Sequence, residues 1–143
     1  MQPANSNDCY DKPQVEECNS NDEGASRRLL FIDDDETILE GYKFIFECEG
    51  FTVDVALDAE SAMKLVAENP YSVIVMDYVL PETNGVDLAE KIQSIDDSIN
   101  LIIISGQKGI EEEIKLRNID ISGIFLKPLK IETLVDHIVQ LFD

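Results

Sequence analysis

Four segments with polar side chains suited to phosphoryl chemistry each follow a short apolar run in this chain. Residues 33–35 are three aspartates, and Asp77, Ser105 and Lys127 follow later apolar runs one at a time. Crowded carboxylates repel one another unless a cation joins them, and a hard ion such as Mg²⁺ prefers oxygen ligands. An ammonium and a hydroxyl group beside such an ion match the charge of a phosphoryl group, which a carboxylate can itself accept. The residue types therefore predict a site that carries an aspartyl phosphate.

The elements that must position these side chains are five short apolar runs that alternate with helical periods. Four runs are nearly continuous in large apolar residues, which is typical of strands covered on both faces, whereas the second alternates and suits a sheet edge. The predicted strands are 29–32, 51–56, 73–76, 101–104 and 124–126, and the predicted helices have apolar stripes over 38–46, 59–66, 86–95, 110–116 and 131–142. This alternation predicts an α/β fold with a parallel sheet and helices on both faces. Ligands of such sheets bind outside the carboxyl ends of the strands, where the strand order reverses.

Each polar residue also has a purely structural interpretation. Asp35 is expected to cap the helix that follows it, and the acidic run 111–113 is expected to be a solvated helix start. Three acids directly after a buried strand are more than a cap needs. Ser105 and Lys127, taken singly, are typical of a turn and of an exposed surface. They gain a functional interpretation only together with the carboxylates.

The composition of the chain restricts its partners. The chain has 143 residues, with 30 acidic and 11 basic side chains and a formal net charge of −19. A surface this acidic repels nucleic-acid phosphates and anionic lipid, so no direct nucleic-acid binding is expected. No apolar run approaches the roughly 18 residues that a membrane helix needs, so no membrane insertion is expected. The length and the hydrophobic content of 44% predict one domain with a substantial core.

The N-terminal segment indicates the domain organisation of the chain, and the cysteines indicate the cellular compartment. Residues 1–26 are acidic and poor in large apolar side chains, which predicts a flexible tail before a folded domain at 27–143. The N-terminus lacks the features of a secretory signal. Cys9, Cys18 and Cys48 are an odd number without C-x-x-C spacing, which predicts reduced thiols in a cytoplasmic compartment, with Cys48 as a small filler beside a helix.

Residues 28–143 resemble the receiver domain of two-component response regulators. The matching pieces are 31–36 (FIDDDE), 77–85 (DYVLPETNG), 104–106 (ISG) and 127–128 (KP), in this order and at fitting spacing. The resemblance implies a CheY-like, flavodoxin-like (βα)5 fold, a doubly wound five-stranded parallel sheet with strand order 2-1-3-4-5. That order places the first and third strands side by side. Asp33, Asp34 and Asp77 are therefore expected to share one crevice.

The resemblance also implies a role for each site residue. Asp77 would accept the phosphoryl group. Mg²⁺, or Mn²⁺ in its place, would be held by Asp33, Asp34, Asp77 and the main-chain carbonyl of Val79. The phosphoryl group would be bound by the switch residues Ser105, Gly106 and Lys127. The loop after the acceptor would be shaped by Pro81 and Gly85, and the Lys127–Pro128 peptide would be cis.

The sequence departs from the family pattern at three positions. Family members often carry a Tyr or Phe three residues before the lysine, and here that residue is Ile124. A swinging aromatic side chain is therefore not expected. The positions that tune dephosphorylation hold Val79 and Gln107. Because a valine side chain cannot orient a water molecule, the aspartyl phosphate is predicted not to be unusually short-lived.

As a receiver, the protein would be a signalling phosphoacceptor rather than an enzyme acting on other substrates. A sensor histidine kinase or a phosphotransfer protein would donate the phosphoryl group. A downstream effector protein would read the face formed by the fourth helix, fifth strand and fifth helix. A phosphorylation-dependent homodimer is a further expected partner arrangement. The chain ends at Asp143 after the last predicted helix, so a standalone regulator is expected.

Two other functions compete with this interpretation. Asp33-x-Asp35-x-Thr37 after a strand has the form of the nucleophile motif of haloacid-dehalogenase-type phosphatases, in which Asp33 would be the nucleophile. The aspartate trapped as the acyl phosphate would distinguish the two, being Asp77 in a receiver. The second alternative is a receiver scaffold that never takes phosphate, which usually lacks the acceptor or the acids.

Overall fold

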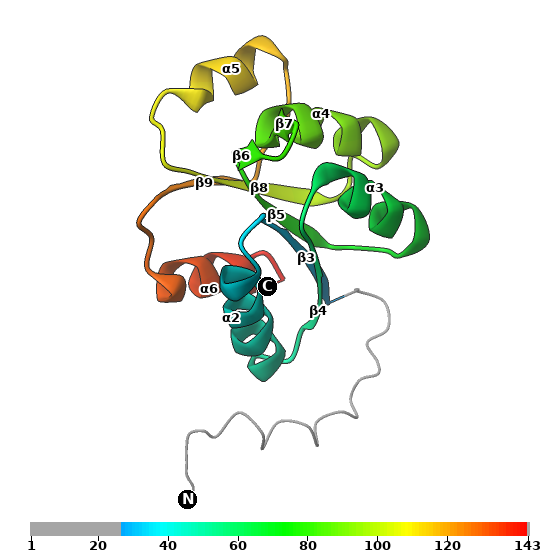
Figure 1. The fold of residues 1–143 in the computed structure, drawn as a ribbon, viewed down its shortest axis with the longest axis vertical. Coiled ribbons are helices and arrows are strands. Elements are labelled where there is room, and N and C mark those ends of the chain that lie inside the picture. Colours follow the sequence, from blue (N-terminus) through cyan, green and yellow to red (C-terminus); the bar gives the residue numbers. More distant parts are fainter. Residues whose placement is uncertain (1–26, 143) are drawn as a thin grey trace, which may run out of the picture.

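We describe residues 27–142 of a computed structural model, so the predicted tail at 1–26 lies outside the described residues. The strands of the main sheet are β3 (Arg28–Ile32), β4 (Thr52–Ala56), β5 (Val73–Asp77), β8 (Asn100–Ser105) and β9 (Gly123–Leu126). The helices are α2 (Glu36–Cys48), α3 (Ala59–Glu68), α4 (Gly85–Ile95), α5 (Ile110–Leu116) and α6 (Ile131–Gln140). A short antiparallel hairpin of β6 (Val79–Leu80) and β7 (Thr83–Asn84) lies between β5 and α4 (Figure 1).

The main sheet is parallel throughout, and its strands follow the order β4-β3-β5-β8-β9. In chain order this is 2-1-3-4-5, so the predicted CheY-like topology is confirmed. β3 pairs with β4 on one side and with β5 on the other. The strand order therefore reverses at β3, and the carboxyl ends of β3 and β5 lie next to each other.

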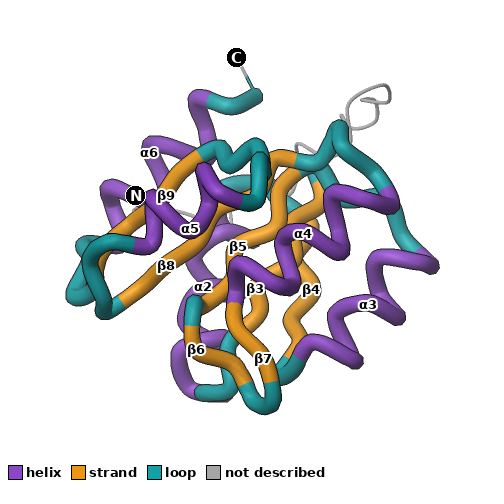
Figure 2. The backbone as a smooth tube through the Cα atoms, turned by 90° about the horizontal axis from the view of Figure 1, so that it is seen from above, coloured by secondary structure: helices purple, strands orange, loops and turns teal. Residues whose placement is uncertain are grey.

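Two apolar layers cover the faces of the sheet, with α3, α4 and α5 on one face and α2 and α6 on the other (Figures 1 and 2). Successive side chains of β3 alternate between the layers: Leu30 and Ile32 face the first, and Leu29 and Phe31 the second. This alternation follows from the two-residue period of a strand. Because both faces are covered, the central strands are apolar at nearly every position.

Local signals set the helix starts. Asp35 caps α2 by accepting hydrogen bonds from the Thr37 and Ile38 amides, as predicted. Asp58 and Asn84 cap α3 and α4 in the same way. A capping side chain satisfies backbone N–H groups that have no partner within the helix. Of the three aspartates before α2, Asp35 therefore caps the helix, whereas the carboxylates of Asp33 and Asp34 do not.

Some sequence-based expectations were wrong. β9 is an edge strand and only partly buried, with Leu126 45% exposed, so it lacks the cover expected for a continuous apolar run. Leu116 was assigned to an apolar stripe, but it is 87% exposed because α5 ends there. The hairpin β6–β7 was not predicted, since strands of two residues are too short to give a periodic signal.

Cys48 corrects the expectation for the cysteines. It is the last residue of α2 and is disulfide-bonded, whereas the sequence predicted a reduced side chain. Spacing along the chain gave no signal, because disulfide formation depends on proximity in the fold. Cys9 and Cys18 lie outside the described residues. Within residues 27–142, none of the helices has the length and apolar character needed to cross a membrane.

Candidate functional site

The strand order brings three predicted site residues together. Asp33 and Asp34 follow β3, and Asp77 is the last residue of β5. Each offers a carboxylate oxygen, and these three oxygens all lie within 4.8 Å of one another. Asp33 and Asp77 are buried, at 7% and 8% exposure, whereas Asp34 is exposed. The site thus consists of two buried acids at the carboxyl ends of β3 and β5 and a third acid that is open to solvent.

Burial and charge shape the ionisation of Asp33. Burial raises the pKa of the Asp33 carboxyl, and the neighbouring Asp77 carboxylate raises it further. The Asp35 amide donates a hydrogen bond to Asp33 Oδ1 at 3.0 Å, which opposes these effects without cancelling them. Tyr42 also has a raised pKa, because it is buried and lies near Asp33 and Asp77. The protein therefore holds negative charge here at a cost that a bound cation would relieve.

Asp77 has two contacts that aim its carboxylate. The Lys127 Nζ lies 3.0 Å from Asp77 Oδ2 and forms an ion pair with it. The Val79 amide donates to Asp77 Oδ1 at 3.4 Å. Lys127 follows β9, and its amide donates to the Ser105 carbonyl at 2.8 Å, which ties the two strand ends together. The lysine amine therefore faces the predicted acceptor, and the predicted cis peptide at Lys127–Pro128 is confirmed.

Ser105 lies at the carboxyl end of β8, with its side chain fully buried. Its Oγ donates to the Gln107 carbonyl at 2.9 Å and accepts from the Gln107 amide at 2.8 Å. The hydroxyl group is therefore engaged within its own loop, and its role toward a phosphoryl group stays a prediction. Gly106 is the exposed residue that follows, and a Cβ built there meets nothing within 4 Å.

The loop after Asp77 is closely packed against α4. Gly85 begins α4, and a Cβ at this position would lie 2.8 Å from the Asp77 carbonyl oxygen. Only glycine allows this approach of the helix to the acceptor backbone. The Val79 side chain is 59% exposed, and the role of its carbonyl as a metal ligand stays a prediction. Ile124 is half-buried and packs against the core. This position therefore has no aromatic ring that could swing.

The donor set fits a hard divalent cation. Three carboxylate oxygens, two of them from buried side chains, provide the all-oxygen environment that Mg²⁺ prefers, and the open side at Asp34 leaves room for water ligands. Lys127 supplies a positive charge on the other side of Asp77. A carboxylate placed between a metal position and an ammonium group is suited to receive a phosphoryl group.

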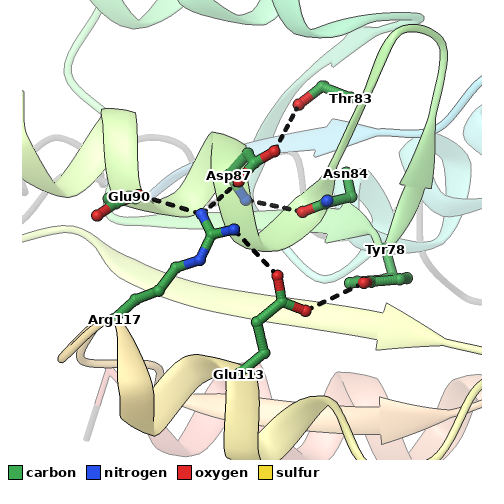
Figure 3. A network of polar contacts seen from close by, with 7 residues as sticks. All are labelled: Tyr78, Thr83, Asn84, Asp87, Glu90, Glu113 and Arg117. Carbon is green, nitrogen blue, oxygen red and sulfur yellow. Dashed lines mark hydrogen bonds and ion pairs between the residues drawn. The ribbon is translucent and has the colours of Figure 1, made fainter.

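Sequence reasoning missed a polar network beside this site (Figure 3). The Arg117 guanidinium contacts the carboxylates of Asp87 and Glu90 on α4 and of Glu113 on α5. Tyr78, directly after Asp77, donates from its hydroxyl to Glu113 Oε1 at 3.1 Å. The one signal in the sequence was the i,i+4 spacing of Glu113 and Arg117. The acidic run 111–113 was interpreted as a solvated helix start, which is wrong for Glu113.

Comparison with known proteins agrees with this geometry. The family model of the response regulator receiver domain matches residues 29–139. Response regulator MprA of Mycobacterium sp. (strain KMS) is 23% identical over 108 residues, covering 76% of this chain and 47% of that protein. MprA of Mycobacterium leprae is 22% identical over 111 residues, covering 78% and 49%. The chain thus spans about half the length of these curated relatives.

Solved structures give the same result. A CheY-like receiver domain protein from Methanospirillum hungatei JF-1 superposes with a TM-score of 0.76 at 26% identity, covering 83% of this chain and 95% of that one. The receiver domain of the Francisella response regulator 1452 gives a TM-score of 0.72 at 29% identity, covering 80% and 95%. From the family match, the topology and the clustered acids, we conclude that the chain belongs to the response regulator receiver domains of two-component systems.

Proposed function

We propose that this receiver domain is a phosphorylation switch in which Asp77 accepts a phosphoryl group from a phosphohistidine. The donor would be a sensor histidine kinase or a phosphotransfer protein. One observation carries the proposal: Asp77 is buried where the strand order reverses, with Lys127 Nζ at 3.0 Å and two further carboxylates within 4.8 Å. This is the arrangement that in-line transfer to a carboxylate requires, because positioning and charge stabilisation are its main needs.

The transfer is a substitution at phosphorus. A carboxylate oxygen of Asp77 forms the new O–P bond as the N–P bond of the phosphohistidine breaks, and the imidazole nitrogen keeps the electron pair and takes up a proton. Lys127 balances negative charge beside the acceptor. Ser105 would donate its hydroxyl to a phosphoryl oxygen after leaving Gln107, and the Gly106 amide lies in the same loop. Loss of the phosphoryl group follows by attack of water on phosphorus.

Mg²⁺ belongs to this proposal as the ion that Asp33, Asp34 and Asp77 would hold, with the Val79 carbonyl as a further ligand. When bound, it supplies positive charge to the carboxylates and to the phosphoryl oxygens. The proposal is supported by the raised pKa of Asp33, which reflects negative charge held in a buried place. Among structures of this fold, TrrA from Thermotoga maritima was solved with Mg²⁺ and BeF, at 22% identity and a TM-score of 0.70.

We further propose that the protein acts only on itself and not as an enzyme on other substrates. Its output would be contact with an effector through α5, β9 and α6, or dimerisation through that face. The NtrC4 receiver domain, 28% identical with a TM-score of 0.73, was solved as a beryllofluoride-activated dimer. Because Val79 cannot orient an attacking water, the phosphorylated form is proposed to persist well beyond the dead time of a mixing experiment. A cytoplasmic location fits an acceptor for a kinase.

Intact-mass measurement tests the proposal. The protein is incubated with Mg²⁺ and acetyl phosphate, and the gain of one phosphoryl group is followed in wild type, Asp77→Asn and Asp97→Asn. Asp97 is an exposed aspartate in the turn after α4 and serves as the matched control. We expect the gain in wild type and Asp97→Asn, and its loss in Asp77→Asn and with chelator. A gain of the same size in Asp77→Asn would refute the assignment.

A further inference from the structure

Helix α5 is the shortest of the five helices that the structure describes. It spans Ile110–Leu116, and its N-cap Gly109 has no side chain that could satisfy the first amides. Within the described residues, this helix buries two side chains, those of Ile110 and Ile114. A seven-residue helix is marginal on its own, so its place depends on tertiary contacts. The polar contacts of α5 therefore act together with these two buried side chains in fixing its position.

Those contacts converge on Arg117, the C-cap residue of α5. Its Nη1 contacts Asp87 and lies 3.1 Å from Glu90 Oε1, so the guanidinium joins α5 to α4. Its Nη2 lies 3.1 Å from Glu113 Oε2, one turn back in α5 (Figure 3). The Arg117 side chain is 30% exposed, which leaves the ion pairs partly shielded from solvent. The planar guanidinium can meet several carboxylates at once, which a lysine ammonium does less well.

Glu113 extends the network to the acceptor. Its Oε1 accepts the hydrogen bond from the Tyr78 hydroxyl, and Tyr78 is the residue after Asp77. The Tyr78 backbone is already fixed, because its amide donates to the Ile104 carbonyl at 2.8 Å and its carbonyl accepts from the Gly85 amide at 2.7 Å. In the Tyr78–Glu113 contact, Tyr78 is therefore held by backbone hydrogen bonds of its own. The network fixes α5 to the acceptor loop, and it contributes little to fixing the acceptor.

The other end of α5 leads back to Ser105 through residues 106–109. This loop contains two glycines with open space around them, and Gly109 has φ of 91°. The Ser105 hydroxyl donates one hydrogen bond to the Gln107 carbonyl and accepts one from the Gln107 amide, and the donated bond must break before the hydroxyl can donate elsewhere. A change at Ser105 would therefore alter the contacts of residues 106–109, which lead to the start of α5. The Arg117 network lies at the other end of the helix, where its ion pairs to α4 would resist a displacement of α5.

We propose that Arg117 and Glu113 are positioning residues that hold α5 in its unphosphorylated arrangement and so limit phosphoryl binding at Asp77. This inference rests on the proposed function, since it assigns a regulatory brake to the same site. A contact made in one state and weakened in the other shifts the equilibrium by the difference. Loss of the network should therefore loosen α5 and strengthen binding of a phosphoryl mimic. Simple damage to the domain would weaken that binding, so the direction of the effect is diagnostic.

Two measurements on the full chain test this brake. Hydrogen exchange of residues 110–116 is measured without ligand, and beryllofluoride affinity in Mg²⁺ is measured by calorimetry. The variants are Glu113→Gln and Arg117→Ala. The control is Glu47→Gln, because Glu47 forms a comparable i,i+4 ion pair with Lys43 on α2 at 2.6 Å. We expect faster exchange in α5 and about twofold to fivefold tighter beryllofluoride binding for Glu113→Gln, with a similar or larger effect for Arg117→Ala. Glu47→Gln should change neither.

The outcomes separate the brake from the proposed function. Unchanged exchange in α5, or unchanged or weaker beryllofluoride binding, in folded Glu113→Gln and Arg117→Ala would overturn the brake while leaving the switch intact. Absence of beryllofluoride binding in wild type would overturn the phosphoryl switch itself and the brake with it. Tyr78→Phe removes the hydroxyl donor alone and keeps the ring, so it should reproduce the Glu113→Gln effects on exchange and affinity. Failure to do so would contradict the assigned path from α5 to the acceptor loop.

Discussion

Gly85→Ala is expected to disturb the acceptor backbone directly. A Cβ at this position would lie 2.8 Å from the Asp77 carbonyl oxygen and 3.2 Å from Tyr78 Cα. Ordinary contact begins near 3.4 Å, and the atoms in the way are backbone atoms that cannot rotate aside. The methyl group must therefore push α4 away from the strand end that carries Asp77.

The size of the effect follows from two opposing contributions. Overpacking of this kind costs about 1–3 kcal/mol, and replacing glycine by alanine in a helix returns up to about 1 kcal/mol. We expect a net loss of about 1–2 kcal/mol in the free energy of unfolding, with a lower yield of phosphorylated protein. Gly41→Ala is the matched control, because Gly41 lies within α2 and a Cβ there meets nothing within 4 Å. That variant should gain about 0.4–1 kcal/mol.

Urea denaturation of both variants, with phosphorylation yield from acetyl phosphate, provides the assay. The two variants are expected to differ by about 2 kcal/mol, with Gly41→Ala the more stable and normally phosphorylated. If Gly85→Ala is as stable as Gly41→Ala and phosphorylated as well as wild type, the close approach of α4 to the acceptor does not constrain the site, and the reasoning fails.

Three further predictions concern the metal site and the core. Mg²⁺ at ten times its dissociation constant should stabilise the fold by about 1.4 kcal/mol in thermal unfolding, and Asp34→Asn or chelator should abolish most of this gain. Equal stabilisation of Asp34→Asn by Mg²⁺ would contradict the assignment of Asp34 as a ligand. Because the pKa of Asp33 is raised by burial, its charge destabilises the metal-free fold above that pKa, so stability should increase as pH falls through the raised pKa toward the ordinary pKa of an aspartate. Asp33→Asn should be more stable than wild type at pH 7 without metal and should lack this dependence, and a less stable variant would count against the burial argument. Leu39→Ala should lower the free energy of unfolding by about 2–5 kcal/mol, whereas Leu116→Ala should change it by less than about 0.5 kcal/mol, because Leu39 is 2% and Leu116 87% exposed. Similar losses in the two variants, measured by denaturation, would refute the assignment of Leu116 to the surface.

The fold could be predicted because its signals are local and repeated. Each central strand is a short apolar run covered on both faces, and the alternation with helical stripes leaves one architecture. The burial of edge strands was predicted less well, because an edge strand such as β9 is apolar in sequence but only partly covered. The strand order itself came from the resemblance and not from the pattern of apolar residues.

The site was predictable to the extent that each residue ends a strand. Asp33, Asp77 and Lys127 meet because parallel strands place their carboxyl ends at one edge. The contacts of Ser105 with Gln107 and of Tyr78 with Glu113 had no sequence signal, because they depend on how a loop and a short helix pack. The same limit applies to the disulfide at Cys48, which spacing along the chain did not indicate.

The central claim is that Asp77 carries the phosphoryl group, and chemical trapping of the acyl phosphate tests it most directly. Borohydride reduces an aspartyl phosphate to homoserine, so peptide mass mapping of phosphorylated and reduced protein identifies the residue that carried it. We predict homoserine at position 77 and at no other aspartate. Homoserine at position 33 would contradict the account and would favour a phosphatase that uses Asp33 as its nucleophile.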